Sequence, residues 1–224
     1  MIRNLFLLFL ILPQIIFTQT NPEEKLGSWW MYFGTHQLNE KFSIHYESQL
    51  RNYEVFNNFF QLLPRAGLNY HINKKSMITA GYAWIPTQPI IDYGWNNELV
   101  IENRIWEQFI LRNKIDKIKI RHRFRLEQRW IKYVGVSFFK NRARYMLSLR
   151  IPLSKDSEFP LFISLYDEIF LNISETPFDQ NRLYGALGIQ INKNMNIQGG
   201  YLRHRAGSQN LNRFQLAVFL NTGN

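Results

Sequence analysis

The sequence predicts an all-β protein, an antiparallel transmembrane β-barrel whose strands follow one another as an up-and-down meander. Three observations predict it. Apolar and polar residues alternate with a period of two, the alternating segments are long, and aromatic residues make up 16% of the 224 residues. Such alternation gives a strand one apolar and one polar face. A tilted strand needs only about 9–11 residues to cross a bilayer.

The first residues have the three regions of a secretory signal peptide. Arg3 supplies a basic start, an apolar run extends from Leu5 to Phe17, and polar residues follow. The run is shorter than the roughly 20 residues of a transmembrane helix. We therefore predict a cleaved signal peptide at 1–19 and a single barrel domain at 20–224, located in the outer membrane of a Gram-negative cell. An uncleaved interfacial anchor is the alternative.

The segment from Lys117 to Trp130 shows the alternation most clearly. Its even positions carry Ile, His, Phe, Leu, Gln and Trp, and its odd positions carry Lys, four Arg and one Glu. A helix would spread the arginines around its axis, whereas a strand places them all on one face. The segments 42–51 and 142–151 repeat this division, so each is predicted to be a strand.

Turn residues divide the rest of the chain into further strands. The predicted strands are 28–36, 41–54, 58–71, 76–86, 102–114, 117–131, 140–153, 160–173, 180–191, 195–205 and 212–222. Bacterial single-chain barrels have even strand numbers. We therefore predict twelve strands, with ten as the alternative, and the missing one would lie in 87–101 or 20–27. Longer loops are expected at 87–101, 132–139, 174–179 and 206–211.

Aromatic residues occur near the predicted strand ends and on the apolar faces. Examples are Trp29, Trp30, Trp106, Trp130 and Tyr201. Barrels collect such residues in girdles at the two membrane interfaces, facing outward. The competing explanation is that aromatic residues favour strands in general.

The formal charge of +10 is carried on period-two faces, not in clusters or tails. This distribution and the export signal argue against a nucleic-acid partner. We expect the charges to face the lumen as a polar network. The candidate members are Arg123, Arg125, Glu127, Arg129, Arg142, Arg144, Glu168, Asn172 and Arg182, with Glu47, Glu102 and Glu107 as further partners. Two hypotheses remain open: a salt-bridged core that fills the lumen, and a wet cationic path that favours anions.

No catalytic or metal-binding pattern is present in the sequence. The absence of Cys excludes disulfides, cysteine zinc sites and thiol catalysis. None of the five His residues has a Ser two positions later, the spacing that would place a hydrolase pair on one strand face. We therefore expect neither an enzyme nor a bound metal or cofactor.

Several segments resemble one bacterial family in their order and spacing. They are Arg125–Arg129, Arg142–Tyr145, Tyr166–Asn172, Phe178–Arg182, Gly200–Leu202 and Asn212–Phe214. The chain resembles the DUF2490 family of outer-membrane proteins of unknown function. The resemblance implies a β-barrel in the outer membrane and implies no particular activity.

The expected function is that of a structural outer-membrane barrel or a narrow passive pore with an Arg/Glu-lined lumen. Its partners would be outer-membrane lipid and, during biogenesis, the barrel assembly machinery. The alternatives are a binding or assembly factor that uses its loops and, below it, a lipid hydrolase. A soluble β-sandwich or lipocalin-like barrel is the architectural rival, since both folds alternate.

Overall fold

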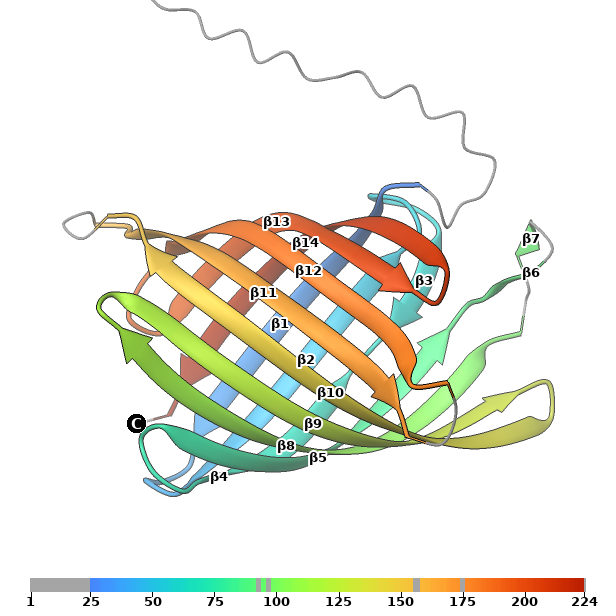
Figure 1. The fold of residues 1–224 in the computed structure, drawn as a ribbon, viewed down its shortest axis with the longest axis horizontal. Helices are drawn as coiled ribbons and strands as arrows, with labels where there is room; N and C mark the ends of the chain where they lie inside the picture. Colours follow the sequence, from blue (N-terminus) through green and yellow to red (C-terminus); the bar gives the residue numbers. More distant parts are fainter. Residues whose placement is uncertain (1–24, 92–93, 96–97, 155–157, 174–175, 224) are drawn as a thin grey trace, which may run out of the picture.

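The computed structural model describes residues 25–91, 94–95, 98–154, 158–173 and 176–223. They form a twisted sheet that closes on itself as a barrel (Figure 1). Its strands are β1 (Gly27–Gln37), β2 (Phe42–Asn52), β3 (Phe59–Leu62), β4 (Arg65–His71), β5 (Ser76–Thr87), β8 (Val100–Ile115), β9 (Ile118–Tyr133), β10 (Val136–Pro152), β11 (Leu161–Asn172), β12 (Phe178–Gln190), β13 (Met195–Ala206) and β14 (Gln209–Thr222). The predicted signal peptide at 1–19 lies outside the described residues. In the described ranges, no helix is long and apolar enough to cross a membrane.

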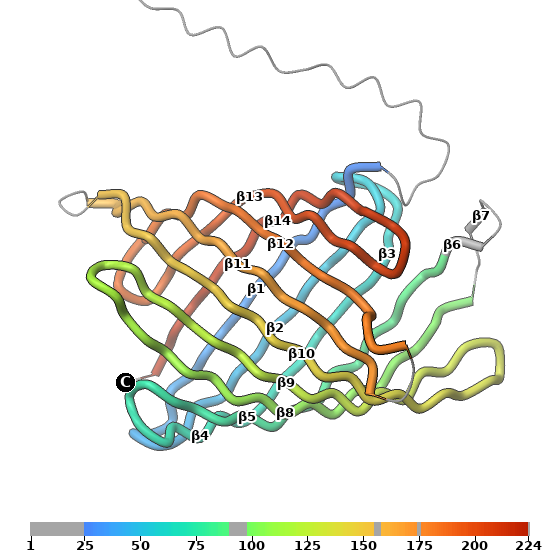
Figure 2. Tube along the Cα trace, in the orientation of Figure 1, coloured from blue at the N-terminus to red at the C-terminus, as the bar shows by residue number. Residues whose placement is uncertain are grey.

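Eleven strands form the closed ring, and each of the eleven predicted segments has a counterpart in it. Consecutive strands pair antiparallel, which confirms the all-β meander. The ring closes differently, because β1 and β14 lie side by side (Figure 2) and pair in parallel. In this pairing Met31 is opposite Ala217. An odd number of alternating strands leaves the first and the last running in the same direction. The expectation that the ring holds an even number is therefore wrong.

The sheet nevertheless has twelve strands, as predicted. The twelfth arises because the predicted segment 58–71 is divided into β3 and β4 at Leu63 and Pro64. Leu63 still exchanges backbone hydrogen bonds with Gln49, at 2.8 and 3.2 Å. Proline has no N–H to donate, so the ladder is interrupted there. β3 continues the line of β4 beside β2 and β5, outside the ring. Within 87–101, β6 (Ile90–Ile91) and β7 (Gly94–Trp95) form a separate two-stranded pair.

Two of the predicted long loops are tight hairpin turns. β9 and β10 are joined by only Val134 and Gly135, whose φ angles are 47° and 77°. β13 and β14 are joined by Gly207 and Ser208. Two-residue hairpins with positive φ at both positions usually carry Asn-Gly or Asp-Gly. Val-Gly lacks that signal, and this explains why 132–139 was expected to be a loop.

The chain enters and leaves the barrel at opposite ends. We call the end with Gly27 and the connections 53–58 and 134–135 the N-terminal rim, and the end with Thr222 and the connections 38–41, 72–75 and 116–117 the C-terminal rim. In Figure 1 the C-terminal rim lies on the left, where the chain end is marked, and the β9–β10 hairpin projects at the other end. Each rim is the open end of one half of the lumen, and the two halves differ.

Candidate functional site: the barrel lumen

The polar faces predicted from the sequence point into the barrel. On β9, Arg125 and Glu127 are buried, while Phe124, Leu126 and Trp130 between and beyond them are exposed on the outside. The same alternation recurs along β10 and β11. Because each strand places alternate residues on opposite faces, a meander brings the inward charges of neighbouring strands together.

Glu127 is the centre of the network. Its carboxylate lies 3.3 Å from Nη1 of Arg104, 2.7 Å from Nη2 of Arg142 and 2.5 Å from Nη1 of Arg144. Arg125 is more distant, at 3.9 Å, and donates to the Gln108 amide oxygen instead. The Glu127 side chain has no exposed surface. A carboxylate removed from water in this way requires several charged partners.

Four further carboxylates extend the network to other inward arginines. The pairs are Arg123–Glu168 (2.7 Å), Arg144–Glu168 (2.7 Å), Arg104–Glu102 (2.6 Å), Arg129–Glu102 (2.9 Å), Arg142–Asp179 (2.8 Å) and Arg65–Glu47 (3.0 Å). Arg104, Arg142 and Arg144 each bridge two carboxylates. All of these pairs except Arg65–Glu47 are therefore connected to one another through Glu127.

Buried aromatic rings stack against the arginines. The Trp106 ring lies 4.7 Å from Cζ of Arg125 and 5.9 Å from Cζ of Arg65, and it fits above Gly67 and Gly81 on β4 and β5. A Cβ on Gly81 would lie 2.6 Å from the indole and 2.3 Å from the carbonyl oxygen of Ala66. The prediction that Trp106 faces outward is therefore wrong, because the glycine pair leaves room for its ring inside.

A second aromatic group comes from β1 and β11, which carry Trp29 and Phe170. Arg51 stacks 3.9 Å from the Trp29 ring, and Arg182 lies between the rings of Trp29 and Phe170, at 4.7 and 4.4 Å. Trp29 is thus also inside the barrel, contrary to the expected outward girdle. These rings fill space between the charges and exclude water from them.

The structure brings together seven of the nine predicted network residues. These are Arg123, Arg125, Glu127, Arg129, Arg142, Arg144 and Glu168. Arg182 lies beside them and donates to Gln180 at 3.1 Å. Asn172 does not join, because it lies at the end of β11 and donates to the Thr176 carbonyl at 3.3 Å. Glu107 is exposed on the outer face and accepts from Gln128 there, so its expected lumen role is wrong.

Sequence reasoning missed several members of the network. Arg104 shares the inward face with Glu102 and could have been found from that alternation. Arg65 shares its inward face with Leu63 and Asn69, so no run of charges marks that face as polar. Asp179 was placed in a predicted loop, although β12 begins at Phe178 and carries it.

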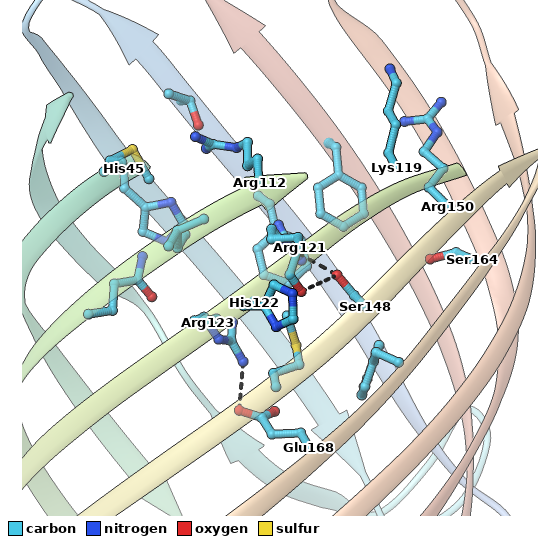
Figure 3. Close-up of a pocket in the computed structure, with 18 of the residues that line it drawn as sticks. His45, Arg112, Lys119, Arg121, His122, Arg123, Ser148, Arg150, Ser164 and Glu168 are labelled. Atoms are coloured by element: carbon cyan, nitrogen blue, oxygen red, sulfur yellow. Dashed lines mark hydrogen bonds and ion pairs between the residues drawn. The ribbon is translucent and has the colours of Figure 1, made fainter. Parts of the chain in front are cut away.

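The two halves of the lumen differ. Toward the N-terminal rim, buried side chains fill the interior, including Tyr53, Leu63, Ile85, Glu102 and Arg104. Toward the C-terminal rim lies a cavity of about 1390 Å³ that reaches from Arg125 and Glu168 to Lys74 and Lys119. Figure 3 shows part of this cavity, in which Arg121 donates to Ser148 and Arg123 contacts Glu168. The ion-pair network therefore forms the floor of a cavity.

The chemistry of this site is that of anion contact. Its donors are guanidinium and ammonium groups, which bind carboxylates and phosphates. Among the described residues, no group of three or more His, Asp or Glu side chains is arranged to hold a metal ion. The predictions of no cofactor and no enzymatic activity stay predictions.

Comparison with known proteins gives one result. The model of the family described as "Protein of unknown function (DUF2490)" matches residues 26–215. No match was found among curated proteins or among solved structures. The matched range begins just before β1 and ends within β14, so it includes every strand that contributes to the lumen network. The chain belongs to the DUF2490 family of proteins of unknown function.

Proposed function

We propose that this protein is a structural barrel of the bacterial outer membrane, exported by its N-terminal segment and closed to free ion flow by the network around Glu127. The observation that carries the proposal is the inverted distribution of side chains. Charged groups pair inside the barrel, while large apolar residues are exposed outside. A soluble barrel has the opposite arrangement, and soluble monomers rarely expose extensive apolar surface.

The outer face supports a membrane position along individual strands. On β13, the outward residues change from Ile197 through Tyr201 to Arg203 and Arg205 as the strand approaches the N-terminal rim. β14 changes in the same sense, from Val218 and Leu216 through Phe214 to Asn212 and Asn210. An apolar belt that gives way to aromatic and then polar residues is typical of membrane barrels. The belt would lie toward the C-terminal rim.

The filled half of the lumen supports a closed barrel. Ions would have to pass Glu127, Trp106 and Phe170, which are almost entirely buried. Opening this region would separate buried ion pairs, which is strongly destabilising. The cavity on the C-terminal side therefore resembles a vestibule that ends at the network.

Cell fractionation and planar-bilayer conductance test the proposal together. We expect the native protein to sediment with outer membranes, to need detergent for release, and to give no steady conductance after insertion into bilayers. Recovery from the soluble periplasm would refute the membrane position. A steady conductance whose ion selectivity changes in Arg125→Glu, but not in the outward-facing control Arg203→Glu, would refute the closed lumen and favour the passive pore.

The β9–β10 hairpin favours binding of a partner as a second candidate function. Its tip exposes Val134, Val136, Phe138 and Phe139, and the hairpin projects beyond the rest of the barrel (Figure 1). Val134 has a φ of 47°, which is unfavourable for a β-branched residue. Replacing Phe138 and Phe139 with Ser should abolish capture of a cross-linked partner in intact cells while the barrel still folds. Unchanged cross-links would exclude this role for the hairpin.

A further inference from the structure

The cavity toward the C-terminal rim has a large excess of positive charge. Thirteen Lys and Arg residues line it, whereas the only carboxylates among its described lining residues are Glu47 and Glu168. Both carboxylates are already paired, Glu47 with Arg65 and Glu168 with Arg123 and Arg144. The charges nearer the opening therefore have no acidic partner in the lining.

Several of these cations face each other directly across neighbouring strands. Arg112 on β8 is opposite Arg121 on β9, and Lys119 on β9 is opposite both Lys114 on β8 and Arg150 on β10. Figure 3 shows Arg112, Arg121, Lys119 and Arg150 on this wall. Like charges directly opposite each other destabilise a sheet. A bound anion would compensate these charges and remove the repulsion, so the arrangement is consistent with an anion-binding role.

The floor of the cavity carries guanidinium groups with unused donors. Within the described part of the chain, Nε and Nη1 of Arg65, Nε of Arg123 and Nη1 of Arg125 have no hydrogen-bond partner. The side chains of Arg65 and Arg125 are only 4% and 2% exposed. Arg65 and Arg125 both lie over the Trp106 ring, with Cζ at 5.9 and 4.7 Å, and Arg123 lines the same cavity two residues before Arg125 on β9. Buried donors normally have partners, and an anion between these groups would supply one.

Other parts of the cavity wall are apolar. They include Met31 and Phe33 on β1, Phe219 on β14, Met77 on β5 and Met146 on β10. Thioether side chains adapt readily to the shape of an apolar ligand. The cavity of about 1390 Å³ exceeds the usual range of small-molecule sites, so it has room for more than an inorganic ion.

We infer that this cavity binds an amphiphilic organic anion whose phosphate or carboxylate group lies among Arg65, Arg123 and Arg125 and whose apolar part lies along Met31, Phe33 and Met146. The lysines at the rim attract the anion toward the opening. The unpaired donors assign the anionic end to the floor of the cavity, between Arg65 on β4 and Arg123 and Arg125 on β9. The repelling cross-strand pairs on β8–β10 add positive charge nearer the opening. The inference goes beyond the structural role and does not depend on the membrane position of the barrel.

Calorimetric titration of the full-length barrel in a neutral maltoside detergent tests the inference, with hexyl phosphate and inorganic phosphate as probes. We expect hexyl phosphate to bind at least tenfold more tightly than inorganic phosphate, and its affinity to fall as NaCl rises. Arg125→Gln should weaken hexyl phosphate at least tenfold, since it removes a charged donor while Glu127 keeps three other arginines. The matched control Arg203→Gln removes one charge from the outer face and should leave the affinity unchanged.

Three results would overturn the inference. Absence of hexyl phosphate binding to the folded wild-type barrel would show that the cavity is not a site for amphiphilic anions. Equal affinity for the two probes would mean that the apolar wall of the cavity contributes nothing to binding. Equal weakening by Arg125→Gln and Arg203→Gln would mean that only the net charge acts. If Arg125→Gln fails to fold, the solvent-accessible pair Lys119→Gln and Arg150→Gln provides the second test and should weaken binding at least fivefold.

Discussion

Arg125 and Arg144 lie directly opposite each other across the β9–β10 ladder, with both guanidinium groups inside the barrel. Such a pair would be repulsive on its own. It is tolerated because Arg144 contacts Glu127 and Glu168, while Arg125 donates to Gln108 and stacks on Trp106. The two like charges are therefore compensated by two carboxylates, an amide oxygen and an indole ring.

Replacing Glu127 with Gln should destabilise the barrel strongly. The change keeps the shape of the side chain but leaves Arg104, Arg142 and Arg144 without their shared buried charge. Breaking a buried ion pair from one side typically costs about 3–5 kcal/mol. Urea unfolding of the purified barrel in detergent measures the change. Glu107→Gln on the outer face is the matched control and should change the free energy of unfolding by less than about 1 kcal/mol, so similar losses in both variants would contradict the central role of Glu127.

Gly81→Ala should also destabilise, for a steric reason. A Cβ at this position would meet the Ala66 carbonyl oxygen at 2.3 Å and the Trp106 ring at 2.6 Å, and neither can move far in a packed lumen. Overpacking of this kind typically costs about 1–3 kcal/mol. The control is Gly185→Ala, whose Cβ would meet only the Leu165 side chain, at 3.5 Å. Thermal unfolding should separate the two variants, and equal stabilities would show that Trp106 does not depend on the space above Gly81.

Replacing Val134 with Asn should stabilise the β9–β10 hairpin. Val134 has a φ of 47°, a conformation that a β-branched residue adopts at a cost of roughly 1–2 kcal/mol and that Asn tolerates. We expect the free energy of unfolding to rise by about 1 kcal/mol. Val136→Asn, at a similarly exposed site inside β10, should lower it slightly because Asn is a poor strand former. A loss of stability in Val134→Asn would mean that Val134 makes a contact that offsets its strain.

Much of the barrel could be predicted because one side of each strand must differ chemically from the other. That requirement produces the period-two alternation from which β9 and β10 were predicted. The same alternation placed Glu127 and Arg142 on the same side of the sheet. The alternation alone cannot say which aromatic residues turn inward, since Trp106 depends on Gly67 and Gly81 in strands that are distant in sequence. The seam between β1 and β14 leaves no local signal either, because it joins the two ends of the chain. The effect of Pro64 was likewise hidden, since one missing donor divides a strand without changing its alternation.

The parallel seam can be tested with an engineered disulfide, because the natural sequence contains no Cys. Thr35 on β1 and Asn221 on β14 are register partners that face the lumen. Neighbouring strands lie about 4.8 Å apart, within the range that a disulfide can span. Thr35→Cys combined with Asn221→Cys should therefore form an intramolecular bond on oxidation, seen as a shift in gel mobility that reductant reverses.

The control moves one Cys by a single position. Leu220 is the partner of Gly34 and faces outward, so Thr35→Cys combined with Leu220→Cys places the two thiols on opposite faces of the sheet. This variant should remain reduced under the same conditions. Bond formation in the control but not in the Asn221→Cys variant would mean that the seam is shifted by one residue. Absence of a bond in both would mean that β1 and β14 are not neighbours, and that the ring is not closed by these eleven strands.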